Sequence, residues 1–504
     1  MVPSMLSHIL SLCTALLSHL KSNTTYYTFA NIQYATATRF SPPRYPPPVN
    51  RRNISDGSQE SICPQAYPAW QFSMISFLGG ENLSNATTEQ LLNVSLVPAV
   101  ETANKSLLPV VVWIHGGGFV QGYKSEDGNG AGLISRAVEM GGEGLVFIAI
   151  NYRLGLFGWL SSGTNTSAQT ITPNVGLHDQ LTALRWVRDY AHLFGGDADR
   201  ITILSESAGA GSALIHLAKL LASDGQHAPL FQRAILQSPY TGLSPSSRTQ
   251  TATYRAVLQA ANVSSFQELG RRDSRTLQDV NQAVIAPSPY GSFAFAPVLD
   301  QATFPFPLAE ISTKHTRKVV ATNSKEGLIF TAPNVQSEQS YMSAVASLVP
   351  EFPPDALARL LSSLYPTASY SNQFERLETT LSDLLIRCTA EYTLSAFAET
   401  SHAYQYSVPS GSHGADLHYT FFDGDVEDLP EHNLTVALAL QGYLASFRLG
   451  GAPEAGVDGV SGLPVYGQGV GVDLNITGIT EEATTWLDKN KCQGLRDILD
   501  GAFA

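Results

Sequence analysis

The stretch that decides the fold is Ile201–Gly211, which reads ITILSESAGAG. Its first half is a run of apolar and β-branched residues, typical of a buried strand, and a helical pattern, Ala208–Leu221, begins in its second half. A serine in a tight turn between strand and helix, with small residues two positions away on either side, is the nucleophile-elbow arrangement. Ser205 stands where a glycine is usual, and serine is small enough for the turn to form. The pattern therefore predicts that Ser207 projects its hydroxyl above a sheet.

Similar apolar runs elsewhere predict the rest of that sheet. Near-continuous apolar runs suit strands that are covered on both faces, and they occur at Pro109–Ile114, Leu145–Asn151, Ile201–Ser205, Arg233–Gln237, Lys318–Thr322 and Ala403–Val408. Helical patterns such as Asp179–Phe194 lie between them, and this alternation predicts an α/β fold with a mainly parallel central sheet flanked by helices. Residues 240–400 are mostly helical in pattern and are expected to form a helical cap insertion. The five prolines of residues 41–52 exclude regular structure there.

A glycine-rich segment, His115–Phe119 (HGGGF), directly follows the strand Pro109–Ile114. Bare backbone can approach a ligand in such a segment, and its N–H groups can hold a developing negative charge in an oxyanion hole. A phosphate-binding loop is the alternative, but no Gly-Lys-Ser/Thr follows. The glycine segment and the serine turn, in this order, predict acyl transfer from an ester.

A serine nucleophile needs a base and an acid that orients the base, and in this type of fold both follow the serine, the acid first. Glu326 comes just after the strand Lys318–Thr322 and is the expected acid, with Asp300, in an irregular loop, as its competitor. His413 lies in a loop just after the strand Ala403–Val408 and is the expected base. The remaining histidines after Glu326 are expected away from the site, at the far end of a strand or in ordinary packed or surface positions: His402, His418 and His432.

With these residues in place, the chain resembles the type-B carboxylesterase and cholinesterase-like family of α/β-hydrolases, especially its secreted fungal esterases and lipases. The resemblance covers nearly the whole chain. Besides the serine turn, its motifs are Phe29–Ala35 (FANIQYA), Trp113–Phe119 (WIHGGGF), Asn151–Gly155 (NYRLG), Asn174–Gln180 (NVGLHDQ), Phe194–Asp197 (FGGD), Lys325–Gly327 (KEG) and His413–Gly414.

The resemblance implies an α/β-hydrolase fold and a role for each residue that matches the family pattern. Ser207 would be the nucleophile, His413 the base and Glu326 the acid. The oxyanion hole would be formed by the backbone N–H groups of Gly117, Gly118 and Ala208.

Three features depart from the family pattern, the first being Ser205 in place of the usual glycine. The family's strands before Phe29 are expected to be shortened or absent. Family members usually pair an early cysteine with one in a Glu-Asp-Cys-Leu stretch, and Cys63 matches the early one, but residues 88–93 read TEQLLN. We expect Cys63 to be free and buried as a small apolar residue. Re-pairing of the other cysteines is the alternative, and Cys388 and Cys492 could meet only if the C-terminal helix packs against the cap.

The leading interpretation is a serine carboxylesterase that forms an acyl-enzyme on small-molecule esters of uncharged, fairly apolar alcohols or acids. This chemistry requires no metal and no organic cofactor. An acyl-transferring or tailoring esterase of small-molecule biosynthesis stays open, because an intact triad does not define the acceptor. A non-catalytic adhesion or binding protein on the same scaffold is a third candidate, although it would not need all three triad residues.

Composition and charge bear on partners and location. The 504 residues are 43% hydrophobic, enough for a large core, and their net charge of −13 disfavours nucleic acid as a partner. No apolar run has the roughly 18 residues of a membrane span, so no integral membrane association is expected. Residues 1–21 resemble a weak signal peptide, and residues 22–504 read as one α/β-hydrolase domain. A secreted glycoprotein is further favoured by ten Asn-x-Ser/Thr sites, Asn23, Asn53, Asn82, Asn85, Asn93, Asn104, Asn165, Asn262, Asn433 and Asn475.

Overall fold

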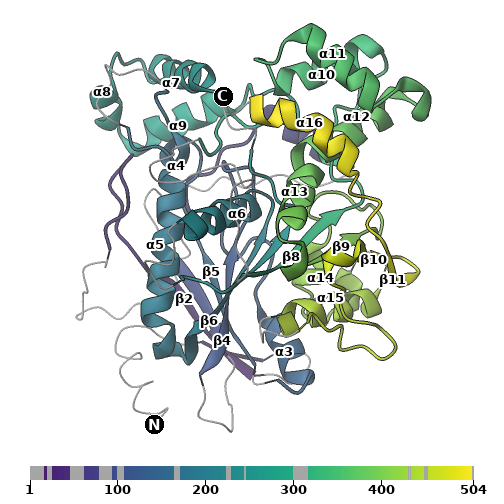
Figure 1. Ribbon diagram of the computed structural model, residues 1–504. Helices are drawn as coiled ribbons and strands as arrows, with labels where there is room; N and C mark the ends of the chain where they lie inside the picture. Colours follow the sequence, from purple (N-terminus) through teal and green to yellow (C-terminus); the bar gives the residue numbers. More distant parts are fainter. Residues whose placement is uncertain are drawn as a thin grey trace.

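A central sheet organises the computed structural model of the chain (Figure 1). The structure describes residues 16–19, 25–45, 62–78, 93–98, 107–142, 144–163, 171–222, 229–242, 246–298, 316–429, 431, 433–447 and 452–501. In this part of the chain, eleven strands form one sheet in the order β1-β2-β3-β5-β4-β6-β7-β8-β9-β10-β11. Neighbouring strands are parallel from β5 through β10 and antiparallel at both ends of the sheet. The predicted mainly parallel α/β sheet is confirmed.

The observed strands can be compared with the six strands that were predicted from apolar runs. The strands are β1 (Leu16–His19), β2 (Thr25–Gln33), β3 (Asn93–Pro98), β4 (Leu108–Ile114), β5 (Val146–Ile150), β6 (Gly196–Glu206), β7 (Arg233–Gln237), β8 (Arg317–Asn323), β9 (Ser401–Tyr406), β10 (Val470–Asn475) and β11 (Gly478–Ala483). All six predicted strands are present as β4–β9. Strand β6 begins five residues before the predicted start, because Gly196 pairs with Leu108 ahead of a register shift.

Alternate residues of the fully buried strand β4 face two hydrophobic cores. Val110, Val112 and Ile114 belong to the core shared with helices α5 and α6. Val111 and Trp113 belong to the core shared with α3 and α15. The sheet is therefore covered on both faces, which explains why its central strands read as continuous apolar runs.

The helices flank the sheet and extend beyond one end of it (Figure 1). They are α2 (Ala69–Leu78), α3 (Ala131–Glu139), α4 (Gly155–Trp159), α5 (Val175–Tyr190), α6 (Ser207–Ala222), α7 (Ser247–Ala260), α8 (Phe266–Gly270), α9 (Ser274–Ile285), α10 (Glu338–Leu348), α11 (Pro354–Leu364), α12 (Gln373–Ser382), α13 (Cys388–Ala396), α14 (Leu417–Thr420), α15 (Leu434–Phe447) and α16 (Lys489–Gly501). Shorter helical turns are η1 (Ala191–Phe194), η3 (Leu328–Phe330), η4 (Thr367–Ser369), η5 (Asp383–Arg387), η6 (Ala398–Thr400), η7 (Val426–Asp428) and η9 (Tyr466–Gln468). The helix expected at Asp179–Phe194 is α5, which begins four residues earlier, continued by η1.

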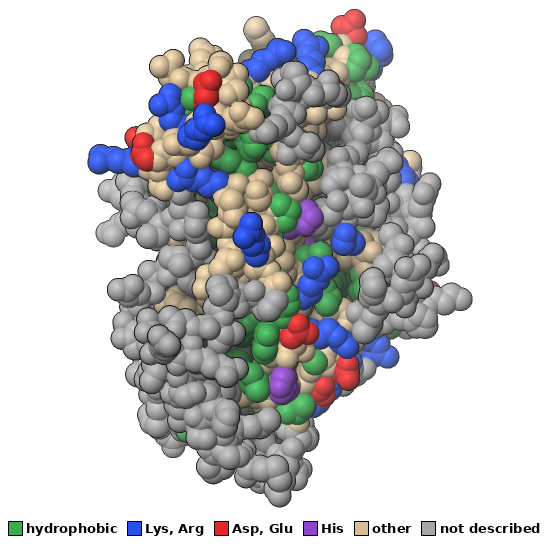
Figure 2. Space-filling view, turned by 90° about the vertical axis from the view of Figure 1, so that its left-hand side faces the viewer, with side chains coloured by type: hydrophobic (Ala, Val, Ile, Leu, Met, Phe, Trp, Pro, Cys, Tyr) green, Lys and Arg blue, Asp and Glu red, His purple; other side chains and the backbone are tan. Residues whose placement is uncertain are grey.

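Residues 240–400 contain two groups of helices with a strand of the sheet between them. Helices α7–α9 lie at the upper left of Figure 1 and α10–α12 at the upper right, while β8 runs in the sheet below. Where the face seen in Figure 2 belongs to described residues, Lys and Arg side chains are interspersed with Asp, Glu, apolar and uncharged ones.

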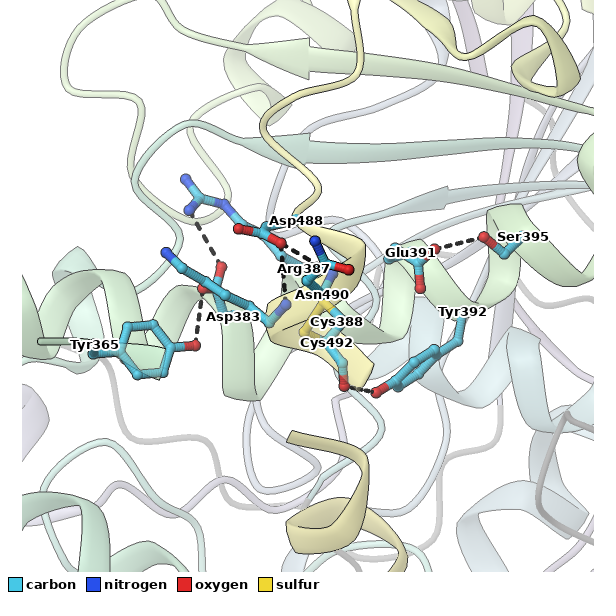
Figure 3. The surroundings of a disulfide bond; sticks show 11 residues. Tyr365, Asp383, Arg387, Cys388, Glu391, Tyr392, Ser395, Asp488, Asn490 and Cys492 are labelled. Carbon is cyan, nitrogen blue, oxygen red and sulfur yellow. Dashed lines mark hydrogen bonds and ion pairs between the residues drawn. A yellow bond between two sulfur atoms is a disulfide. The ribbon is translucent and has the colours of Figure 1, made fainter. Parts of the chain in front are cut away.

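The cysteines Cys388 and Cys492 form a disulfide, with Cα atoms 5.1 Å apart across a sequence separation of 104 residues (Figure 3). The C-terminal helix α16 packs against η5 and α13. This packing is what the sequence analysis required for Cys388 and Cys492 to meet. The Tyr392 hydroxyl also donates a hydrogen bond to the carbonyl oxygen of Cys492. Cys63 is free and only 1% exposed, as predicted.

Before Phe29 the chain contains β1 and the first four residues of β2, and these two strands pair with each other. Of the two alternatives expected for the strands before Phe29, shortened or absent, the described residues thus show short strands. Four of the residues assigned to the signal-like segment, 16–19, form β1.

The sequons that fall on described side chains differ in exposure. Asn262 is exposed, whereas Asn433 and Asn475 are partly buried. The amide of Asn433 donates weakly to the carbonyl oxygens of Asn475 and Ile476. Asn93 lies in β3, and the other predicted sites lie outside the described residues: Asn23, Asn53, Asn82, Asn85, Asn104 and Asn165. Among the described helices, none is long and apolar enough to cross a membrane.

Candidate active site

The turn between β6 and α6 holds Ser207 in a strained conformation. Its φ is 50°, in the left-handed region that non-glycine residues rarely adopt, and it is 6% exposed. Ser205 fits in place of glycine because its hydroxyl donates to the carbonyl oxygen of Ile235 on β7, at 3.0 Å. Gly209 has no room for a side chain, since a Cβ there would lie 2.1 Å from the carbonyl oxygen of Ile114.

The three predicted triad residues lie in one hydrogen-bonded chain. His413 Nε2 is 2.8 Å from Ser207 Oγ, and His413 Nδ1 is 2.6 Å from Glu326 Oε2. The Glu326 side chain is fully buried and that of His413 is 7% exposed. With Nδ1 donating to the carboxylate, Nε2 is free to accept a proton from the serine hydroxyl.

Hydrogen bonds between adjacent loops fix Glu326 and His413 relative to each other. The other carboxylate oxygen of Glu326 accepts from the Ser238 hydroxyl at 2.6 Å and from the backbone N–H of Asn323 at 2.5 Å. The backbone N–H of Lys325 donates to the carbonyl oxygen of Gly411 at 2.8 Å. The loop after β8 and the loop after β9 are thereby joined just before Glu326 and His413.

Glu206 is a contact of His413 that the sequence analysis missed. Its Oε1 lies 3.2 Å from His413 Nε2, with both side chains buried, but without the alignment of a hydrogen bond. Burial lowers the pKa of His413, yet the carboxylates of Glu206 and Glu326 outweigh it and raise the pKa from 6.5 to about 9. Burial raises the pKa of Glu206, which the imidazolium opposes. Glu206 and Glu326 thus favour the protonated form of His413.

Asp416 is a second missed residue, three positions after His413. It is fully buried and accepts hydrogen bonds from Gln237 and Tyr404, each at 2.9 Å, and a longer one from Asn323 at 3.3 Å. These partners come from β7, β9 and the end of β8. Asp416 therefore connects the His413 loop to three strands of the sheet.

The glycine loop lies directly beside the serine turn. Gly117 and Gly118 both have positive φ, of 97° and 58°, and a Cβ on Gly118 would lie 2.4 Å from the Phe293 ring. Within the described part of the chain, the N–H groups of Gly117 and Gly118 have no acceptor. The N–H of Ala208 is in the first turn of α6, where no intrahelical acceptor exists.

The other histidines considered as the base lie elsewhere or outside the described residues. His402 is on β9 at the end away from the His413 loop, where its Nδ1 is 2.9 Å from the carbonyl oxygens of Leu463 and Pro464. His418 is exposed on α14. His432 and the competing acid Asp300 lie outside the described residues. Among the described residues, no group of three or more His, Cys, Asp and Glu side chains is placed to hold a metal ion.

Aromatic side chains form a wall beside the triad. The Phe330 ring is 5.2 Å from the His413 ring and stacks on Tyr240, which contacts Phe293 in turn. Tyr240 and Phe293 also line a cavity of about 500 Å³ between α7, α9 and the α10–α11 connection. A cavity of this size lies within the range of small-molecule sites, roughly 300–1,000 Å³.

Comparison with known proteins identifies the family of this chain. The model of the carboxylesterase family matches residues 16–493. The chain belongs to the carboxylesterase family. It is 30% identical to "Carboxylesterase patB" of Aspergillus clavatus over 90% of this chain and 89% of the relative. A "Secreted lipase" of Arthroderma benhamiae is also 30% identical, over 69% and 68%. The structure of Aspergillus niger EstA has the same fold, with a TM-score of 0.81, 21% identity and coverage of 99% and 98%. The chain is thus a carboxylic ester hydrolase with an α/β-hydrolase fold, and family membership points to small-molecule ester substrates.

Proposed function

We propose that Ser207, His413 and Glu326 form the catalytic triad of a serine carboxylesterase. The observation that carries the proposal is the continuous hydrogen-bonded chain from Ser207 Oγ through His413 to Glu326. Ser207 attacks the ester carbonyl while His413 takes its proton and Glu326 stabilises the resulting imidazolium.

The glycine loop and the start of α6 would hold the tetrahedral oxyanion. The proposed donors are the N–H groups of Gly117, Gly118 and Ala208, which are free of other acceptors as described above. The tetrahedral intermediate expels the alcohol, which takes the proton from His413. Water activated by His413 then hydrolyses the acyl-enzyme and regenerates Ser207.

The cavity beyond Tyr240 and Phe293 favours an uncharged, apolar substrate group. Its lining is largely proline, alanine, leucine, valine and phenylalanine. Five of its six serine and threonine hydroxyls already donate to protein acceptors: those of Ser246, Thr249, Ser288, Ser292 and Ser347. They leave few donors for a polar ligand. Among the described lining residues, Glu351 carries a carboxylate. It is exposed and accepts hydrogen bonds from the hydroxyls of Ser246 and Thr249.

A panel of p-nitrophenyl esters from acetate to palmitate, assayed with wild type and Ser207→Ala, tests the proposal. Wild type should hydrolyse uncharged esters, and Ser207→Ala should lose kcat by on the order of 10⁴-fold or more while its thermal unfolding stays unchanged. Near-normal activity of the variant on every ester would end the triad assignment. Adding short alcohols to the same assay as acyl acceptors tests for acyl transfer, because an acyltransferase would form the new ester of the added alcohol.

We also propose that the protein is a secreted glycoprotein. Support comes from the ten sequons and the similarity to a secreted lipase. Asn262 is the best described acceptor, because its side chain is exposed at the end of α7. Peptide mass mapping of protein from the culture medium of a fungal host tests this, and an unmodified Asn262 peptide would contradict it.

A further inference from the structure

The segment after Cys63 lies against the downstream half of the glycine loop. The backbone N–H of Ala66 donates to the carbonyl oxygen of Val120 at 3.1 Å. Next to this contact, the buried side chain of Gln65 reaches Gly122, where the loop ends. No disulfide of the described chain involves this segment, so noncovalent contacts must fix it against the loop.

The Gln65 carboxamide pairs with Gly122 as a backbone peptide group would. Its Oε1 accepts from the Gly122 N–H at 2.6 Å, and its Nε2 donates to the Gly122 carbonyl oxygen at 3.0 Å. The same Nε2 donates to the carbonyl oxygen of Cys63 at 2.8 Å. Both amide hydrogens and the oxygen are therefore engaged inside the protein, at 5% exposure of the residue.

The glycine loop is short enough for this anchor to reach the proposed oxyanion donors. The carbonyl oxygen of Gly117 accepts from the N–H groups of Val120 and Gln121, at 3.1 and 3.0 Å, so the turn closes on itself immediately before Gly122. Gly122 has a φ of 102°, and a Cβ there would lie 2.4 Å from His115 Nδ1. A displacement of Gly122 would therefore be transmitted through this turn to Gly117 and Gly118.

We propose that Gln65 is a positioning residue that fixes the glycine loop so that the Gly117 and Gly118 N–H groups point at the oxyanion. This inference rests on the proposed function, because it concerns donors that act only on the tetrahedral intermediate. A purely structural role would lower stability and leave the rate of the remaining folded enzyme unchanged. A positioning role lowers kcat, since misplacement by about 1 Å can cost on the order of 100-fold.

Gln65→Met tests the proposal, because methionine has a similar shape and removes the three hydrogen bonds. We expect kcat to fall by about 10- to 100-fold, with KM changed less than about threefold. Affinity for a trifluoromethyl ketone, which forms an oxyanion on Ser207, should fall by the same factor as kcat. If Gln65→Met does not fold, Gln65→Glu serves instead, since it keeps an acceptor for the Gly122 N–H but loses both donors. Gln65→Glu should then lower kcat and ketone affinity by a common factor, and wild-type values for both would overturn the proposal.

Gln282→Met is the matched control. Gln282 makes the same two-bond pairing with the backbone of Tyr67, accepting from its N–H at 3.1 Å and donating to its carbonyl oxygen at 2.8 Å. Its bonds do not involve the glycine loop, so this variant should lose stability while its kcat and ketone affinity stay within about twofold of wild type. An equal fall in kcat for both variants, or wild-type kcat in Gln65→Met, would overturn the role of Gln65. Loss of the proposed function itself is distinguishable, because the ketone would then also fail to inhibit wild type.

Discussion

The two cysteine-containing regions of the molecule are held in place in different ways. At Cys388 and Cys492 a disulfide joins segments 104 residues apart and fixes the C-terminal helix. At Cys63 the thiol is free, and hydrogen bonds from Gln65, Gln278 and Gln282 hold the segment instead. The disulfide joins α13 to α16, whereas the hydrogen-bonded segment contacts the glycine loop.

The two kinds of link affect different properties: the disulfide affects the stability of the fold, and the hydrogen bonds affect the position of the glycine loop. A disulfide acts mainly on the unfolded chain, by limiting how far its two ends separate. Amide hydrogen bonds such as those of Gln65 are individually weak, but each has a direction and fixes where a backbone group lies. We therefore expect changes at the proposed triad and at Gln65 to alter rates and changes at the disulfide to alter stability.

After Ser207→Ala, the largest rate effect is expected from Glu326→Gln. The amide keeps the shape of the carboxylate but cannot stabilise the imidazolium, so kcat should fall by on the order of 10⁴-fold. Thermal unfolding should change little, since the Ser238 and Asn323 donors still have an oxygen acceptor. Steady-state kinetics with circular dichroism melts measure both quantities. A full-rate Glu326→Gln enzyme would remove Glu326 from the triad and bring Asp300 forward as the acid.

The disulfide should show the opposite pattern. Replacing both Cys388 and Cys492 by alanine should lower the free energy of unfolding by about 2–4 kcal/mol, while kcat stays within about twofold of wild type. Tyr392→Phe removes only the hydrogen bond to the Cys492 carbonyl and should cost about 1 kcal/mol. Denaturant unfolding curves compare the three proteins. A drop in kcat for the folded double variant would show that this covalent region does influence the site.

The pH profile tests the carboxylates around His413. The base works only when neutral, and its raised pKa of about 9 means that the neutral fraction increases as pH rises toward 9. Between pH 6 and 8 kcat/KM should therefore rise by roughly tenfold per pH unit. Glu206→Gln removes one carboxylate, so the midpoint should move down toward 6.5, the ordinary value for histidine. A flat profile from pH 6 to 9 in wild type would contradict this account.

The smallest effect is expected at the free cysteine. Burial raises the pKa of Cys63 to about 12, so the thiol stays protonated and unreactive in the folded protein. Cys63→Ala should cost about 1 kcal/mol of stability, through lost packing, with unchanged kcat. Alkylation by iodoacetamide, followed at the Cys63 peptide, should occur only after unfolding. Rapid labelling of the native protein would show that this segment opens.

Sequence patterns predicted what depends on local structure. The central strands read as apolar runs because both faces of the sheet are buried, and Ser207 was recognisable because strand, turn and helix are adjacent in sequence. Glu326 and His413 followed from the positions of two strand ends. These inferences used neighbouring residues and the order of serine, acid and base along the chain.

The residues that were missed depend on contacts across the fold. Glu206 reaches His413 from a different strand, and Asp416 binds partners on three strands. The Cys388–Cys492 disulfide could be predicted only on the condition that the C-terminal helix packs against the cap. Packing between segments so far apart in the chain does not follow from local sequence. Gln65 gave no signal, since a single glutamine near a proline has many ordinary roles.

Active-site labelling tests the central claim most directly. A fluorophosphonate should add one phosphonyl group to the native protein, and peptide mass mapping should place it on Ser207. Ser207→Ala should take up none, and Gln65→Met should be labelled more slowly than Gln282→Met, because the phosphonyl oxygen occupies the same donors. A label on another residue, or equal labelling of Ser207→Ala, would contradict the account.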